Sequence, residues 1–354
     1  MSERIREHEG RVERARWPRL PSGGTRVVAE MACAHEGGVE RALAIAGAAA
    51  DSGADAIQLQ LLHAEQLVSR RLPAFEQAKQ LELSPESWRA VFAEARSRGL
   101  ECWANVFDEA SLALAVESGA SVLKLHSTDL SNPRMLDAVG ASGRPLSVAV
   151  GGSTLNEIDS ALERLRGRGA EQLVLMHGFQ AYPTSPADSH LRFLATLRRV
   201  FDLPVGYQDH TDGGSLLAFV LPSIAIGLGA AVIEKHITDD RSRRGIDHEA
   251  SLGPEDFSRF VASMRGSDES LGLARYRTPA GAEAAYRERM KKCVVAARGL
   301  PEGHILTESD LVFVRSSPGG VSPARADELV GGRLRRAVDA HENLMPADVA
   351  STEV

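Results

Sequence analysis

Short apolar runs alternate with longer amphipathic segments along the chain from Arg26 onward. The apolar runs lie at 27–31, 54–59, 101–106, 121–125, 145–150, 172–176, 203–207 and 231–235. Segments of helical length between them lie at 39–51, 85–98, 109–118, 154–167, 189–200 and 214–227. A short apolar run bounded by turn residues is typical of a buried strand, and its alternation with helical segments is typical of a parallel sheet. The pattern therefore predicts repeated strand-helix units.

Eight such units over roughly 240 residues favour a closed (β/α)8 TIM barrel over an open doubly wound sheet. No GxGxxG sequence follows the first run, and the pair Gly37-Gly38 lacks the rest of that fingerprint. A dinucleotide-binding sheet therefore has little support. In a TIM barrel the catalytic groups lie where strands end and their following loops begin, so those positions become the candidate site.

The flanks of the barrel differ from it in composition. Residues 1–25 are highly charged and contain Pro and Gly, which predicts a tail, and the barrel is expected at 26–270. A linker with a helical piece is expected at 271–289 and a small domain at 290–354. That domain contains an expected strand, Cys293–Ala297, and a capped turn that begins at Thr307. A unit of this size is expected to lean on the barrel or on another subunit.

Composition limits the partners. With a net charge of -7 and a pI near 5.9, the chain offers no basic surface for nucleic acid. Its sequence contains no signal peptide and no membrane-spanning run. The three cysteines are odd in number and lack metal-type spacing, which fits a reducing cytoplasm.

Polar residues gather where the predicted strands end. Six of the eleven histidines do so, namely His35, His63, His126, His177, His210 and His236. Five acids join them, namely Glu30, Asp129, Asp209, Glu234 and Asp247. Imidazoles serve as metal ligands and proton carriers, and Lys124, at the end of the fourth run, could neutralise a carboxylate or phosphate. Because His210 and His236 follow neighbouring strands, they are expected to share one ion.

Several blocks of sequence carry a family resemblance. They are 28–37 (VAEMACAHEG), 206–211 (GYQDHT), 233–238 (IEKHIT) and 245–252 (GIDHEASL), together with the turns LPEG and PGGVSP after Met290. They resemble the sialic acid synthase family, and the segment from Met290 resembles its antifreeze-like (SAF) domain. The resemblance implies condensation of phosphoenolpyruvate, an anionic three-carbon donor, with an N-acetylated amino sugar. The expected products are a 3-deoxy-2-ulosonic acid and phosphate, and the expected cofactor is a divalent cation, manganese or magnesium.

The resemblance also implies roles for single residues. His210 and His236 match metal ligands. Glu30 and Asp247 match carboxylates that hold sugar hydroxyls, and Glu30 could also orient the attacking water or act as a base. Lys124 is expected to contact the donor.

Further expected substrate contacts come from the loops, the strand ends and the small domain. Ser127 matches a donor contact, and Tyr182 matches an aromatic residue between the two substrates. Arg315 matches an arginine that reaches the sugar across a subunit interface, which implies a domain-swapped homodimer. The remaining expected substrate-binding residues are Gln58, Gln60, Asn105, Asp129, Gln180 and Gln208.

The chain departs from the family on the donor side. Gln58 replaces a lysine, Ala149 and Gln208 replace serines, Asn105 replaces a threonine, and Gln180 replaces an asparagine. Each lost charge-assisted phosphate contact typically removes about 1.5 to 3 kcal/mol. Three hypotheses therefore stand: a synthase of the family type, a metal-dependent aldolase, lyase or isomerase that does not use phosphoenolpyruvate, and a non-catalytic sugar-binding homologue.

Overall fold

The computed structural model describes residues 24–272, 277–317 and 319–350. Most of the charged tail expected at 1–25 therefore lies outside the described residues. The chain divides into two compact units, residues 1–272 and 273–354. Each unit is described by itself below.

The first unit is a closed barrel of eight parallel strands in sequence order. The strands are β1 (Arg26–Glu30), β2 (Ala56–Leu61), β3 (Glu101–Val106), β4 (Val122–Leu125), β5 (Leu146–Ala149), β6 (Leu173–His177), β7 (Val205–Asp209) and β8 (Ala230–His236). Strand β8 pairs with β1 and closes the ring, which confirms the predicted TIM barrel.

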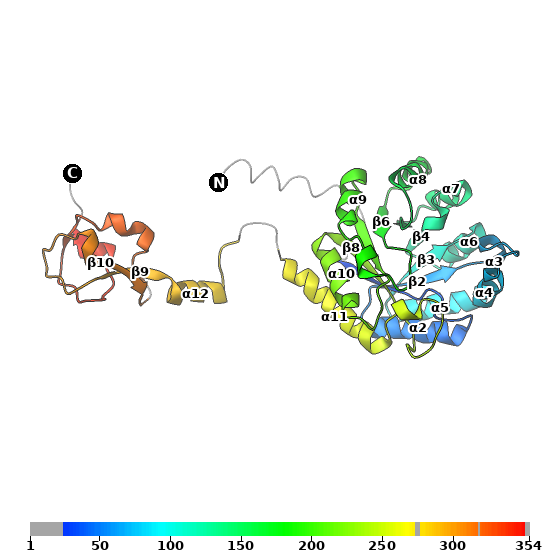
Figure 1. Cartoon of the computed structure of the whole chain (residues 1–354), viewed down its shortest axis with the longest axis horizontal. Helices are drawn as coiled ribbons and strands as arrows, with labels where there is room; N and C mark the ends of the chain where they lie inside the picture. The colour runs from blue at the N-terminus through cyan, green and yellow to red at the C-terminus, as the bar shows by residue number, and fades with distance from the viewer. Residues whose placement is uncertain (1–23, 273–276, 318, 351–354) are drawn as a thin grey trace. The chain divides into compact units, whose positions relative to one another are not determined.

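Helices surround the strands, as Figure 1 shows. They are α2 (Val39–Asp51), α5 (Pro85–Ser97), α6 (Glu109–Glu117), α7 (Pro133–Gly140), α8 (Leu155–Gly167), α9 (Phe193–Phe201), α10 (Leu217–Gly227) and α11 (Pro254–Leu271), with the shorter α3 (Ala64–Leu67) and α4 (Ala74–Leu81) after β2. The sequence pattern missed α7, which has only eight residues. Helix α9 begins later than predicted because His190 takes a left-handed conformation with φ 42°, so no helix can run through it.

Four strands extend further toward their C-terminal ends than their apolar runs predicted. Strand β2 continues to Leu61 rather than Leu59, β7 to Asp209 rather than Tyr207, and β6 and β8 each gain one residue. The added or adjoining residues include Gln60, Gln208 and His236. Polar side chains lie inside these strands because that end of the barrel interior is polar, so hydrophobicity alone ends the strands too early.

The barrel has two apolar layers. One lies between the outer strand faces and the helices. The other fills the half of the barrel interior nearer the N-terminal ends of the strands. It consists of Val28, Ala56, Trp103, Val122, Val174, Met176 and Val232. Strand side chains alternate between the two faces with a period of two, so the inward positions two residues further along each strand form the next layer toward the C-terminal ends of the strands. The candidate site lies in that layer.

The second unit has its own small core. It contains α12 (Ala282–Met290) and the antiparallel pair β9 (Lys292–Ala296) and β10 (Leu311–Arg315), with a second pair β11 (Arg333–Leu334) and β12 (Val349–Ala350). The predicted capped turn is confirmed, because the Thr307 side chain and Asp310 form a reciprocal capping box. No described helix of either unit is both long and apolar enough to cross a membrane.

Candidate functional site

A layer of buried polar side chains caps the apolar interior of the barrel. Its members occupy inward positions of seven strands, and we call them the polar chamber: Glu30, Gln58, Gln60, Asn105, Lys124, Ser147, Gln208, Glu234 and His236. All but the partly exposed Gln60 are buried. The chamber therefore holds six of the expected substrate-binding and catalytic strand residues together with one expected metal ligand, and it also holds Ser147, which sequence reasoning missed.

Lys124 joins the two carboxylates of the chamber. Its Nζ lies 2.7 Å from Glu234 Oε1 and 3.3 Å from Glu30 Oε2, and its side chain is 3% exposed. The amide of Gln58 donates a hydrogen bond to Glu30, and the amide of Gln208 donates one to Glu234 at 2.9 Å. A carboxylate can only accept, so both amide nitrogens are held by the acids and both amide oxygens are left for an occupant of the chamber.

The buried charges shift one another's proton affinity. Burial raises the pKa of Glu30 to about 7, although Lys124 opposes the rise. Burial alone would lower the pKa of Lys124, but the charges of Glu234 and Glu30 raise it above its ordinary value. Lys124 is therefore an ammonium at neutral pH, while Glu30 can both accept and release a proton there.

Several chamber atoms have no hydrogen-bond partner among the described residues. They are Gln58 Oε1, both polar atoms of the Asn105 side chain, Ser147 Oγ, Gln208 Oε1, Glu234 Oε2 and His236 Nδ1. Buried polar groups in native proteins are nearly always paired. Such a concentration at one place is typical of a site that binds a polar ligand.

The two predicted metal ligands lie side by side. The ring centroids of His210 and His236 are 5.4 Å apart with an interplanar angle of 89°. Imidazoles that share an ion place their centroids roughly 5 Å apart, because each nitrogen lies about 2 Å from the ion. The two rings therefore lie side by side, as their places after neighbouring strands predicted, and a shared cation stays a prediction.

The protonation state of the pair also fits a cation. Nδ1 of His210 donates to the carbonyl oxygen of Phe179 at 2.7 Å, which leaves Nε2 as the unprotonated nitrogen. Burial lowers the pKa of His210 to about 4 and the pKa of His236 well below its ordinary value, so both rings are neutral. No cluster of three or more His, Cys, Asp or Glu side chains with metal geometry occurs in the described parts of the chain. Two protein ligands would leave the other positions of an ion open.

Tyr182 covers the histidine pair from the loop after β6. Its ring centroid lies 4.3 Å from that of His210 and 5.7 Å from that of His236. Its hydroxyl donates to Gln180 Oε1 at 2.9 Å. Gln180 and Ser127 in turn line one cleft of ≈ 280 Å³ formed by the loops after β4, β5 and β6. The loop residues expected to bind substrate therefore surround the mouth of the barrel, with Asp129 turned to its own loop, where it accepts from Asn132 at 2.8 Å.

Asp247 lies in the loop after β8 in a left-handed conformation, with φ 62°. Burial raises the pKa of its carboxyl to about 6. Its charge also raises the pKa values of Cys33 and Tyr182, after the larger effect of burial on each. The pKa of Cys33 reaches about 12, so this thiol is not a nucleophile at neutral pH.

Other residues expected at the same rim have structural partners. His63 pairs with Asp108 at 3.0 Å, and His177 bonds the Ser189 carbonyl at 3.0 Å. Asp209 does not face the chamber. Its neighbour Gln208 points inward, so Asp209 points outward to Lys235. Glu234, in contrast, is a direct partner of Lys124 that sequence reasoning placed at the rim without a role.

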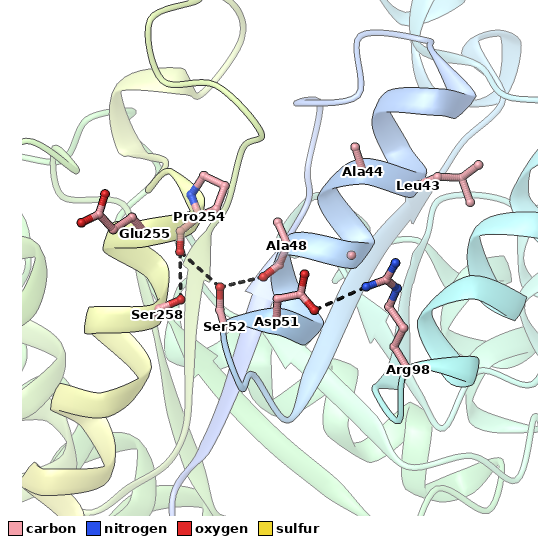
Figure 2. Close-up of a pocket in the computed structure, with 10 residues that line it drawn as sticks. Leu43, Ala44, Ala48, Asp51, Ser52, Arg98, Pro254, Glu255 and Ser258 are labelled. Carbon is pink, nitrogen blue, oxygen red and sulfur yellow. Dashed lines mark hydrogen bonds and ion pairs between the residues drawn. The ribbon is translucent and has the colours of Figure 1, made fainter.

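Arg315, which was expected to bind substrate, is an exposed residue of β10 in the second unit. A groove of ≈ 430 Å³ lies between α2 and α11 on the helical layer, where Arg98 pairs with Asp51 and the Ser52 hydroxyl donates to the Pro254 carbonyl (Figure 2). None of the predicted site residues lines this groove.

Comparison with known proteins identifies relatives of this chain. The NeuB family model matches residues 45–276. The N,N'-diacetyllegionaminic acid synthase of Legionella pneumophila is 32% identical over 347 residues, which cover 93% of this chain and 95% of that protein. The chain belongs to the NeuB family. As a member of the NeuB family it is a sialic acid synthase-like enzyme that forms carbon-carbon bonds in sugar acid synthesis.

The remaining comparisons extend the match to the second unit and to solved structures. A SAF domain model matches residues 291–350, which confirms the predicted antifreeze-like domain. The human N-acetylneuraminate-9-phosphate synthase is 27% identical, with 90% of this chain and 91% of that protein covered. The crystal structure of the N-acetylneuraminic acid synthetase of Leptospira borgpetersenii, in complex with citrate, has a TM-score of 0.69 and 28% identity and covers 75% of this chain and 91% of that one.

Proposed function

We propose that this NeuB-family enzyme condenses phosphoenolpyruvate with the open-chain aldehyde of an N-acetylated amino sugar. A bond forms between the methylene carbon of the donor and the aldehyde carbon, water adds to the second donor carbon, and phosphate leaves. The product is a 3-deoxy-2-ulosonic acid. The observation that carries the proposal is the neutral histidine pair beside a chamber that holds one ammonium and two carboxylates. Relatives named as legionaminic and neuraminic acid synthases support it.

We further propose a divalent cation, manganese or magnesium, held by His210 and His236. When bound, it would polarise the aldehyde and stabilise the developing alkoxide. Tyr182, which packs against both rings, would exclude bulk water from one side of the pair. The carboxylate of Asp247 would accept a hydrogen bond from a sugar hydroxyl.

The chamber residues would handle the donor. Lys124 presents an ammonium where a carboxylate or phosphate could bind. Glu30, with a pKa of about 7, would orient the water that adds to the donor and take its proton. Asn105, Ser147, Gln58 and Gln208 offer hydrogen-bonding atoms that the described protein does not use.

A second candidate function rests on the charge of the chamber. Among the residues of the polar chamber, Lys124 is the one cation, and it is shared by two carboxylates. Gln58 and Gln208 add no charge. This balance suits a less highly charged partner than phosphoenolpyruvate, such as a keto acid, and so favours a metal-dependent aldolase, lyase or isomerase as the alternative.

Release of inorganic phosphate distinguishes the two functions. The enzyme is incubated with Mn²⁺, phosphoenolpyruvate and a panel of N-acetylated and unmodified aldoses, and phosphate is measured with and without each sugar. Sugar-dependent release at a 1:1 ratio with the new acid supports the condensation. If no sugar gives release while pyruvate plus an aldose gives a coupled product by NMR, the second function replaces the first.

Assembly and compartment belong to the same proposal. We propose a domain-swapped homodimer in which Arg315 of one subunit serves the sugar site of the other, and a cytoplasmic location. Light scattering of the full chain tests the dimer. Mixing an Arg315→Ala variant with an inactive barrel variant tests the exchange, because mixed dimers would regain one intact site.

Acceptor binding should depend on pH through Asp247. The carboxylate form of Asp247 accepts a hydrogen bond from a sugar hydroxyl more strongly than the acid form does. Burial raises the pKa of this carboxyl to about 6. The KM for the sugar should therefore rise about tenfold as the pH falls from about 7.5 to 5, while the histidine pair stays neutral. Steady-state kinetics at saturating donor measure it. An Asp247→Asn variant should show a high KM with little pH dependence, and an unchanged slope in that variant would refute the assignment.

A further inference from the structure

A fully buried ion pair lies behind the histidine pair, on the outer face of the barrel wall. Lys235 Nζ is 2.6 Å from Asp209 Oδ2, and both side chains are 0% exposed. Asp209 immediately precedes His210, and Lys235 immediately precedes His236. Since successive strand residues point to opposite faces, the ion pair and the histidine pair share the same stretch of backbone from opposite sides.

The ion pair continues into a small hydrogen-bond network. Lys235 Nζ also donates to the carbonyl oxygen of Thr211 at 2.7 Å. Asp209 Oδ1 accepts from the Thr211 hydroxyl at 2.7 Å and from the Tyr207 hydroxyl at 3.1 Å. One ammonium on β8 thus binds the residue before His210 and the residue after it.

The strand ladder alone does not position His210. Strand β7 ends at Asp209, so His210 lies beyond the last pair that β7 makes with β8, Asp209 with Lys235. At the N-terminal end of β7, the pairing register with β8 shifts between Val205 and Gly206. Contacts other than ladder hydrogen bonds must therefore fix His210 relative to His236, and Lys235 supplies two of them.

The energetics of buried ions point the same way. Removing two charges from water costs several kcal/mol per ion, and replacing a buried pair by neutral residues is often neutral for stability or even stabilising. Stability therefore gives a weak reason for this pair. Outer partners that orient metal ligands, in contrast, commonly change metal affinity by about 10- to 100-fold when they are removed.

We infer that the Asp209–Lys235 ion pair is a positioning device that holds His210 at the correct distance from His236 and so sets the affinity of the site for a divalent cation. The inference rests on the proposed metal function of the two histidines. Asp209 and Lys235 are positioning residues, because neither faces the chamber.

The test compares metal affinity with stability in the full chain. Asp209→Asn with Lys235→Met removes both charges together and leaves no buried charge unpaired. Titration of the metal-free protein with Mn²⁺, followed by calorimetry or by the EPR signal of free Mn²⁺, should show the dissociation constant rising about 10- to 100-fold. The melting temperature of the metal-free protein should change no more than in the control below.

The matched control neutralises another ion pair of the barrel wall. Arg26 and Glu101 are the first residues of β1 and β3, and their ion pair joins the N-terminal ends of these two strands. His210 and His236 lie at the C-terminal ends of β7 and β8. Arg26→Met with Glu101→Gln should lower the melting temperature without changing the Mn²⁺ dissociation constant. A milder variant, Thr211→Val, keeps both charges and loses one hydrogen bond to Asp209, so it should weaken Mn²⁺ binding by a smaller factor even if the double variant fails to fold.

The outcomes separate this inference from the function it rests on. If the wild-type protein binds Mn²⁺ and both the double variant and Thr211→Val bind it equally well, the inference is wrong while the metal site stands. If the control variant loses affinity as much as the double variant, the effect comes from general destabilisation and the inference is also wrong. If the wild-type protein binds no Mn²⁺, the metal site itself is wrong and the inference falls with it.

Discussion

Replacing His210 and His236 together with alanine is expected to abolish Mn²⁺ binding and to lower kcat/KM by roughly three orders of magnitude or more. The two neutral rings, 5.4 Å apart, are the protein's contribution to the proposed cation site. Polarisation of a carbonyl by a metal is worth several kcal/mol in the transition state, and about 4 kcal/mol corresponds to a thousandfold change in rate. Calorimetric titration with Mn²⁺ and the phosphate-release assay measure the two effects.

The matched control for that variant is His63→Ala. His63 also follows a barrel strand, but it bonds Asp108 and its side chain is 46% exposed. This variant should keep full Mn²⁺ stoichiometry and most of the activity. Retention of one tightly bound Mn²⁺ per chain in the His210, His236 double variant would contradict the assignment of these residues as ligands.

Lys124→Met is expected to lower the free energy of unfolding by about 3 to 5 kcal/mol and to abolish donor binding. The substitution leaves Glu30 and Glu234 buried together without their shared cation, and uncompensated buried charge is strongly destabilising. Part of the loss will be relieved by protonation of Glu30, whose pKa is already raised to about 7 by burial. Urea denaturation measures the stability, and titration with phosphoenolpyruvate measures the binding.

Two further variants isolate the cause. Adding Glu234→Gln to Lys124→Met should restore part of the stability, because one buried carboxylate is removed, without restoring donor binding. Lys79→Met removes a cation from the pair with Glu82, where the lysine side chain is 53% exposed. It should leave the free energy of unfolding nearly unchanged, because an exposed ion pair contributes little to stability. Equal losses from Lys124→Met and Lys79→Met would contradict the account of the chamber charges.

The barrel could be predicted because its strands are buried on both faces and therefore consist mainly of apolar residues. The C-terminal ends of β2 and β7 could not be predicted, because Gln60 and Gln208 belong to these strands yet face a polar interior. Helix α7 was missed for a different reason, since eight residues give too few turns to establish a helical period.

The candidate site was predictable in part. Adjacent strands of a parallel barrel bring their ends together, so the proximity of His210 and His236 followed from chain order and is confirmed. Asp209 lies at the same rim, at the end of β7, but it does not face the chamber, because the period of two along a strand gives opposite faces to Asp209 and Gln208. Ser147 gave no signal, because a single serine within an apolar run reads as part of a buried strand.

Roles that depend on three-dimensional contact could not be predicted from single residues. Glu234 is 110 positions from Lys124 in the chain, and only closure of the barrel brings them to 2.7 Å. The resemblance to known synthases located Lys124 but did not show that it is shared between two acids. That sharing is what makes the charge of the chamber nearly balanced.

The unpaired atoms of Asn105 and Ser147 have a practical consequence for finding the natural substrate. Each buried group without a partner costs about 1 to 3 kcal/mol, so any small molecule that pairs with them recovers that energy in the native state alone. The melting temperature should therefore rise when the right compound is present, even before turnover is detectable. A dye-monitored melting screen of metabolites would then identify compounds that bind in the chamber.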